Sequence, residues 1–123
     1  MWLICLIGLL TADAPAAPPP RPVAGDYLVI VFHASWCLPC QALKVNMETE
    51  KVKQAIKDNK INRVMRLDID VAVKSVVAYQ VTEVPTTVLV KMVTADTAVI
   101  VRRSNRLLSV DELVEFVTVS VKD

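Results

Sequence analysis

The hydrophobic positions of the chain predict alternating strands and helices downstream of residue 26. Residues 28–33 are apolar on both faces of an extended chain, which is the pattern of a central, buried strand. A helix is predicted from Cys37, with Pro39 in its first turn, where a missing N–H costs nothing. The apolar face of this helix shifts across residues 48–50, which predicts a bend at that point.

The rest of the chain predicts a strand, a short helix, an antiparallel pair of strands and a closing helix. These elements are a strand over 62–69, a helix over 71–79 capped by Asp70, strands over 87–92 and 97–102, and a helix that begins after Ser109. Ser109 and Glu112 form a capping box, and Leu113, Phe116, Val117 and Val121 lie on the inner face of the helix. The order predicts an α/β fold with a mixed central sheet of about four strands flanked by helices.

The first 25 residues have a different pattern. Residues 1–14 form an apolar leader that is too short to cross a bilayer, which needs about 20 residues. Its length suits a signal-peptide core and residues 12–14 read Ala-Asp-Ala, so export to a periplasm or membrane tethering is favoured. No Lys or Arg precedes the run, and a cytoplasmic protein with an N-terminal strand is the alternative. Cys5 in this run is interpreted as a small hydrophobe. Residues 15–25 predict a Pro-rich linker, which leaves 26–123 as the folded domain.

Composition and charge exclude several classes of protein. The chain has 123 residues, of which 54% are hydrophobic and 22% charged, so it suits one domain with its own core rather than a disordered chain. A formal net charge of +1 gives no electrostatic footprint for nucleic acid. We interpret Arg102, Arg103 and Arg106 as a solvated sheet end. Three cysteines cannot build a disulfide framework, so Cys37 and Cys40 should be working residues.

The stretch from Trp36 to Cys40 carries the chemistry that the sequence predicts. Two cysteines separated by two residues, where a strand leads into a helix, can close a small disulfide and reopen it. The helix N-terminus favours the thiolate of Cys37, which is the form that attacks other disulfides. The alternative is a metal or iron–sulfur site. A Cys-x-x-Cys pair supplies only half of a tetrahedral set, and with Cys5 and His33 as further candidates the site would need two chains.

The order of elements, the Trp-Cys-x-Pro-Cys motif and the later Val84-Pro85-Thr86 together resemble the thioredoxin family. The resemblance implies a thioredoxin-like fold and a thiol-disulfide oxidoreductase. Cys37 would be the exposed attacking cysteine and Cys40 the buried resolving one. Pro85 would face the disulfide after a cis peptide bond, and the backbone of Val84 would pair with an extended substrate segment.

The resemblance also implies a substrate surface and points to departures from the family pattern. Substrate contacts are implied for Trp36, Leu38, Pro39, Val84 and Pro85. Val31 stands where the family has a buried aspartate, and Arg66 where it has the lysine that pairs with that aspartate. His33 shares a strand face with Val31 and could help to transfer a proton, although packing or a surface role is the alternative.

The resemblance implies a protein-disulfide reductase with no metal and no cofactor besides the redox-active Cys37–Cys40 disulfide. No histidine separates the two cysteines, which favours a reductase over a strong oxidant. The implied partners are protein substrates with disulfides and an unknown reductase or electron donor, with no nucleic acid and with membrane contact only through the leader. We expect a monomer. A thioredoxin-fold binding module without turnover is the alternative, because Val31 replaces the aspartate.

Overall fold

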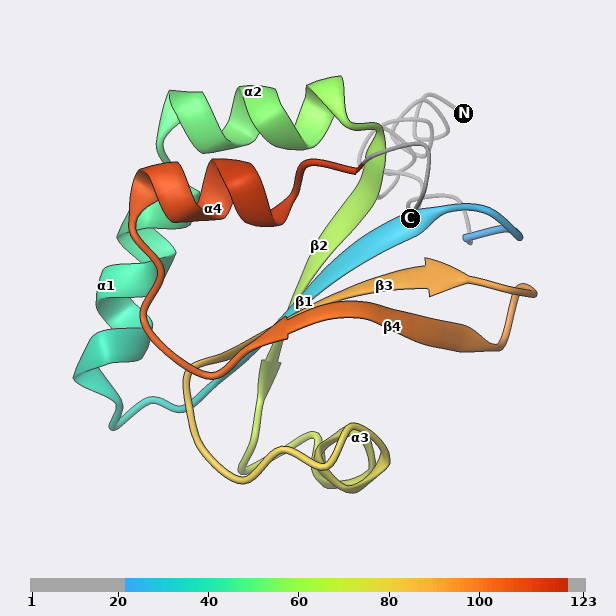
Figure 1. Cartoon of the computed structure of the whole chain (residues 1–123). Coiled ribbons are helices and arrows are strands. Elements are labelled where there is room, and N and C mark those ends of the chain that lie inside the picture. The colour runs from blue at the N-terminus through green and yellow to red at the C-terminus, as the bar shows by residue number, and fades with distance from the viewer. Residues whose placement is uncertain (1–21, 120–123) are drawn as a thin grey trace, which may run out of the picture.

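The computed structural model describes residues 22–119, and a mixed sheet runs through the middle of this part. Its elements are β1 (Tyr27–His33), α1 (Leu38–Met47), α2 (Glu50–Asp58), β2 (Ile61–Asp68), α3 (Val73–Ala78), β3 (Thr86–Met92), β4 (Ala98–Ser104) and α4 (Val110–Phe116). The four strands lie in the order β2-β1-β3-β4 (Figure 1). β1 pairs in parallel with β2 and antiparallel with β3, and β3 pairs antiparallel with β4. The predicted mixed sheet flanked by helices is confirmed.

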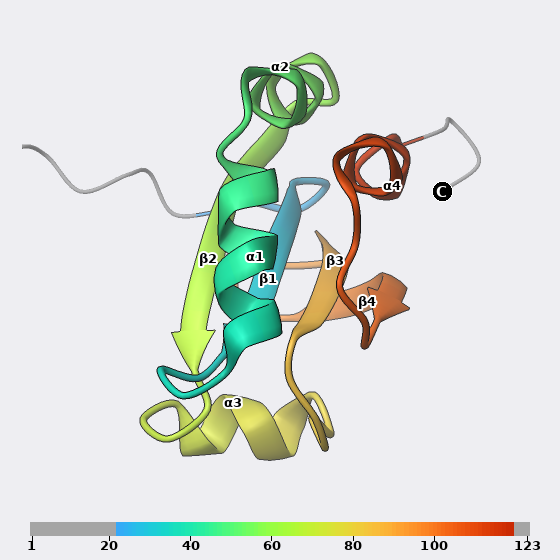
Figure 2. The same ribbon diagram turned by 90° about the vertical axis from the view of Figure 1, so that its left-hand side faces the viewer.

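The two faces of β1 supply two separate cores. Val29 and Val31 belong to a core shared with α1, α2 and α4, whereas Leu28, Ile30 and Phe32 belong to one that Val76 of α3 joins. Figures 1 and 2 show α3 on one side of the sheet and the other three helices on the opposite side. Successive strand residues point to opposite faces, so a strand covered on both sides needs apolar residues throughout. The predicted central strand is therefore correct.

The predicted bend is a complete break between two helices. α1 ends at Met47 and α2 starts at Glu50, with Thr49 as the N-cap of α2. The hydroxyl of Thr49 accepts a hydrogen bond from the Val52 N–H at 3.4 Å and donates to the Asn46 carbonyl at 2.8 Å. Restarting the helix lets α2 turn its own buried residues toward the core, which a bent but continuous helix would not do.

Asp70 does not cap a helix, contrary to the prediction. α3 begins later than expected, its N-cap position is Ala72, and no side chain caps it. The carboxylate of Asp70 instead accepts a hydrogen bond from the indole N–H of Trp36 at 3.2 Å. The backbone N–H of Asp70 donates to the Asp68 carboxylate at 2.8 Å. Asp70 therefore connects the end of β2 to the loop that carries the two cysteines.

The capping box at the start of α4 is confirmed. Ser109 accepts a hydrogen bond from the Glu112 N–H at 3.2 Å, and its own N–H donates to the Glu112 carboxylate at 3.1 Å. Leu113, Phe116 and Val117 are buried as expected. Val121, predicted on the same face, lies outside the described residues.

The other predicted strand boundaries are correct to within one or two residues. The leader at 1–14 and residues 15–21 of the linker lie outside the described part, so the predictions for them stay predictions. Within residues 22–119, no helix combines the length and the apolar character needed to cross a membrane.

Replacing Ser109 with Ala should lower the free energy of unfolding by about 1 kcal/mol, because an N–H in the first turn of α4 loses its acceptor. Urea denaturation of the oxidised protein measures the change. The control is Ser35→Ala, since Ser35 is exposed and lies outside every helix. Equal stability of the Ser109 variant and the unmodified protein would contradict a stabilising role for the capping box.

Candidate active site

Cys37 and Cys40 form a disulfide at the N-terminus of α1, with their Cα atoms 5.3 Å apart. Cys37 is the N-cap residue, and its sulfur accepts a hydrogen bond from the Cys40 N–H at 3.2 Å. Pro39 lies in the first turn, which contains no acidic side chain. The positive end of the helix dipole and a backbone amide therefore both face the Cys37 sulfur. This arrangement favours the anionic form of that sulfur when the disulfide is reduced.

Both cysteines are buried in the disulfide state. Cys37 is 5% exposed and Cys40 is 2% exposed, so the expectation of an exposed Cys37 is wrong for this state. The two residues form a small apolar cluster with Ala34, and Ile69 and Val84 pack against it. Segments from three parts of the chain thus cover the disulfide. This apolar cover leaves the two sulfurs little contact with water.

Apolar side chains project into solvent on the motif itself. Trp36 is 66% exposed and Leu38 is 74% exposed, so Trp36 flanks the site rather than being enclosed in it. The bond from the Trp36 indole to Asp70 fixes the position of its ring, and Val71 beside Asp70 is also exposed. An exposed apolar surface of this kind suits contact with another polypeptide.

The loop before β3 forms the opposite side of the site. The Val84–Pro85 peptide bond is cis, Pro85 is buried, and Val84 packs against the cysteine cluster. The hydroxyl of Thr86 donates to the Glu83 carbonyl at 2.6 Å, and the amide of Asn105 donates to the Glu83 carboxylate. Both bonds are accepted by Glu83, the residue before Val84, and they tie it to the start of β3 and to the chain after β4. The structure therefore brings the Val84-Pro85 segment to the Cys37–Cys40 disulfide.

His33 and Arg66, which the sequence analysis singled out, lie on the neighbouring strands β1 and β2. Val31 is fully buried, and its neighbour in β2, Arg66, is exposed. His33 is half-buried at the end of β1, opposite Asp68. Burial lowers the pKa of His33, and the charges of Arg66 and then Lys44 lower it further, while Asp68 raises it. The net shift favours the neutral form of the imidazole.

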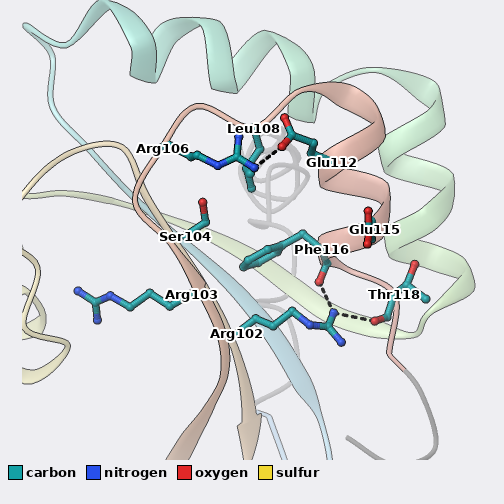
Figure 3. Close-up of a pocket in the computed structure, with 9 residues that line it drawn as sticks. All are labelled: Arg102, Arg103, Ser104, Arg106, Leu108, Glu112, Glu115, Phe116 and Thr118. Carbon is teal, nitrogen blue, oxygen red and sulfur yellow. Dashed lines mark hydrogen bonds and ion pairs between the residues drawn. The ribbon is translucent and has the colours of Figure 1, made fainter.

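A hollow of about 600 Å³ lies between β4 and α4 (Figure 3). Inside it, the guanidinium of Arg102 donates to the carbonyls of Phe116 and Thr118, both at 2.7 Å, at the C-terminal end of α4. Arg106 forms an ion pair with Glu112. These arginines bind groups of the chain itself, so we assign the hollow a structural role. Among residues 22–119, no group of three or more His, Cys, Asp or Glu side chains is placed to hold a metal ion.

Comparisons with known proteins agree with this architecture. The family model described as Thioredoxin matches residues 23–117. Among solved structures, a thioredoxin from Thermus thermophilus has a TM-score of 0.62 at 18% identity, covering 75% of this chain and 71% of that one. A thioredoxin from Fasciola hepatica has a TM-score of 0.57 at 25% identity, covering 76% and 80%. Thioredoxin-2 of a malaria parasite has a TM-score of 0.60 at 17% identity, covering 82% and 97%. No curated protein sequence matches the chain. The chain belongs to the thioredoxin family.

The structure adds three residues to the site that the sequence analysis missed. Ala34 and Ile69 help to cover the disulfide, and Asp70 positions Trp36. The sequence did contain a signal for Ile69 and Asp70. These two residues directly follow β2, the parallel neighbour of β1, and the carboxyl ends of parallel strands meet at one edge of a sheet.

Replacing His33 with Asn should remove a pH dependence of stability. The pKa of His33 is lowered by folding, so the unfolded chain binds the proton first, and unfolding becomes easier as the pH falls through about 6.5. Urea denaturation between about pH 8 and pH 5.5 measures the free energy of unfolding. This free energy should decrease toward the lower pH in the unmodified protein and should not do so in the variant. His33 is the single histidine of the chain. An unchanged slope in the variant would therefore show that another group is responsible.

Proposed function

We propose that the protein is a thiol-disulfide oxidoreductase that reduces or exchanges disulfides of protein substrates. The observation that carries this proposal is the hydrogen bond from the Cys40 N–H to the sulfur of Cys37, at 3.2 Å, in the first turn of α1. Membership of the thioredoxin family and the Cys37–Cys40 disulfide support the same general chemistry. The redox-active disulfide serves as the only cofactor in this proposal.

The reaction takes place in two exchanges. The thiolate of Cys37 attacks a sulfur of the substrate disulfide, forming a mixed disulfide and releasing the other substrate sulfur as a thiolate that takes up a proton. Cys40 then attacks the sulfur of Cys37, which breaks the mixed disulfide and releases the second substrate thiol. Two electrons pass to the substrate, and the Cys37–Cys40 disulfide forms. A separate electron donor reduces that disulfide for the next cycle.

Substrate binding follows from the two sides of the site. Trp36, Leu38 and Pro39 provide the apolar surface on the motif side, and the Val84-Pro85 segment provides the other side. An extended segment of the substrate lies between them and pairs its backbone with that of Val84, as a strand added to a sheet edge does. The exposed apolar side chains of Trp36 and Leu38 select the substrate by shape and apolar contact.

Replacing Cys37 with Ser should abolish the reduction of insulin by a dithiol donor, because the attacking sulfur is lost. Replacing Cys40 with Ser should instead trap insulin on Cys37, since the resolving sulfur is lost. Turbidity measures turnover, and mass spectrometry detects the mixed disulfide. Ala42→Ser is the control, because Ala42 is exposed on α1. Full turnover by the Cys37 variant would refute the proposed function.

Replacing Leu38 with Ser should raise KM for insulin roughly fivefold, corresponding to about 1 kcal/mol of lost apolar contact. The rate with a small soluble disulfide reagent should stay near its original value, because such a reagent does not need the protein-binding surface. Val45→Ser is the matched control, as Val45 is 66% exposed on the same helix. If activity toward insulin and toward the small reagent falls equally, the substitution affects the reactivity of the cysteines rather than the binding of a protein substrate.

A further inference from the structure

Thr87 carries a hydroxyl that the proposed reaction has not yet used. Its side chain is completely buried, and among the described residues its Oγ1 has no hydrogen-bond partner. Burying a hydroxyl without a partner is costly, and such groups are rare in native proteins. A partner that becomes available in another state of the protein would explain why the hydroxyl is retained.

The sheet places Thr87 under the helix that carries the cysteines. Thr87 lies directly opposite Val31 in the antiparallel pair of β3 and β1, so the two side chains share one face. Val31 belongs to the core on the α1 side, together with Leu43 of that helix. Cys40 lies one turn before Leu43 on the same buried face of α1. The face that contains Thr87 is therefore the face toward which Cys40 points.

Thr87 and Cys40 both lie near the beginning of their elements, Thr87 in β3 and Cys40 in α1. Thr87 is near the start of β3, which follows directly on the loop where Val84 packs against the cysteine cluster. Figure 2 shows β3 beginning at the same end of the sheet as α1. Thr87 therefore lies at the disulfide end of the core.

Cys40 needs a hydrogen-bond donor when the disulfide opens. It is 2% exposed, and burial disfavours a thiolate. The N–H of Cys40 donates to the sulfur of Cys37, so it does not stabilise a thiolate on Cys40. Val31, which lies opposite Thr87 on this face of the sheet, is apolar and has no donor. Thr86 and Thr87 are the buried polar residues of the described part of the chain, and of the two only Thr87 lies on this face of the sheet.

We propose that the hydroxyl of Thr87 donates a hydrogen bond to the sulfur of Cys40 in the reduced protein and in the mixed disulfide. Thr87 is then a catalytic residue of the second exchange, an assignment that rests on the function proposed above. It goes beyond that function by naming the group that prepares Cys40 for attack.

The second exchange balances without another reactant. The sulfur of Cys40 forms a bond to the sulfur of Cys37, and the bond between Cys37 and the substrate sulfur breaks. The electron pair of the broken bond leaves on the substrate sulfur, which takes up the proton that Cys40 has released. Thr87 keeps its own proton and binds the charge on Cys40 until the new disulfide forms. The hydroxyl then has no thiolate to bind, as observed in the disulfide state.

Two substitutions separate the hydroxyl from the shape of the side chain. Thr87→Val keeps the branched shape and removes the hydroxyl, whereas Thr87→Ser keeps the hydroxyl. In protein carrying Cys37→Ala and ¹³C-labelled cysteine, the Cβ resonance of Cys40 reports its ionisation directly. The midpoint should rise by about one pH unit in Thr87→Val and stay near its original value in Thr87→Ser. With Cys37 present, the rate of the second exchange at pH 7 should fall about threefold in Thr87→Val, because the smaller thiolate fraction is partly offset by the higher nucleophilicity of a more basic thiolate.

Thr86→Val is the matched control for the titration. Thr86 is equally buried and adjacent in sequence, but it points to the other face of the sheet, and its hydroxyl is bonded to the Glu83 carbonyl. It should leave the Cys40 midpoint unchanged. A midpoint that does not move in Thr87→Val, or that moves equally in Thr87→Ser, would overturn the proposal.

The titration does not depend on turnover, so the two proposals can fail separately. Unmodified protein that does not reduce insulin would contradict the proposed function, while the titration still decides whether Thr87 binds Cys40. If Thr87→Val does not fold, the pH dependence of the Thr87 Cβ resonance in the Cys37→Ala protein tests whether Thr87 binds Cys40. That resonance should titrate together with Cys40, and a flat response across the same pH range would overturn the assignment.

Discussion

The hydrogen bond from the Cys40 amide to the sulfur of Cys37 fixes both the start of α1 and the place where chemistry can occur. The first amides of a helix have no acceptor within it, and a side-chain oxygen at the N-cap commonly supplies one. In this chain a sulfur takes that position. A thiolate accepts a hydrogen bond more strongly than a neutral disulfide sulfur does, so the same bond strengthens when Cys37 is reduced. The helix start and the reactivity of Cys37 are therefore one physical feature.

That helix start depends on the sheet below it. β1 is buried on both faces, so its carboxyl end is held firmly. The position of β1 therefore fixes the short loop that leads to Cys37. β2 ends beside β1 because the pair is parallel, which brings Ile69 over the disulfide and Asp70 to the indole of Trp36. β3 runs in the opposite direction, so its first residues, rather than its last, arrive at the same edge. One edge of the sheet thus receives three segments that are distant in sequence.

Local signals predicted the features that local interactions determine. The continuous apolar run of β1, the motif and the capping box at Ser109 each depend on residues close in sequence, and each was recognised. The break before Glu50 is also local, since Thr49 caps α2, but the shift of the apolar face indicated only a bend. The role of Asp70 depends on a distant partner. Asp70 looked like an N-cap, but an indole from another loop binds its carboxylate. The burial of Cys37 was missed for the same reason, because the cover comes from Ile69 and Val84.

Burial has opposite consequences for the two redox states of the site. An apolar cover suits a neutral disulfide and penalises either thiolate, so each sulfur needs its own compensation when the disulfide opens. Cys37 receives it from the helix N-terminus, where its sulfur accepts the Cys40 N–H. The amide of Cys40 is already engaged in that bond, so the Cys40 sulfur needs a donor from elsewhere. The two sulfurs therefore differ in what can stabilise their anions, although one helix turn carries both. The hydrogen bond proposed from Thr87 would supply the stabilisation that the helix N-terminus does not give to Cys40.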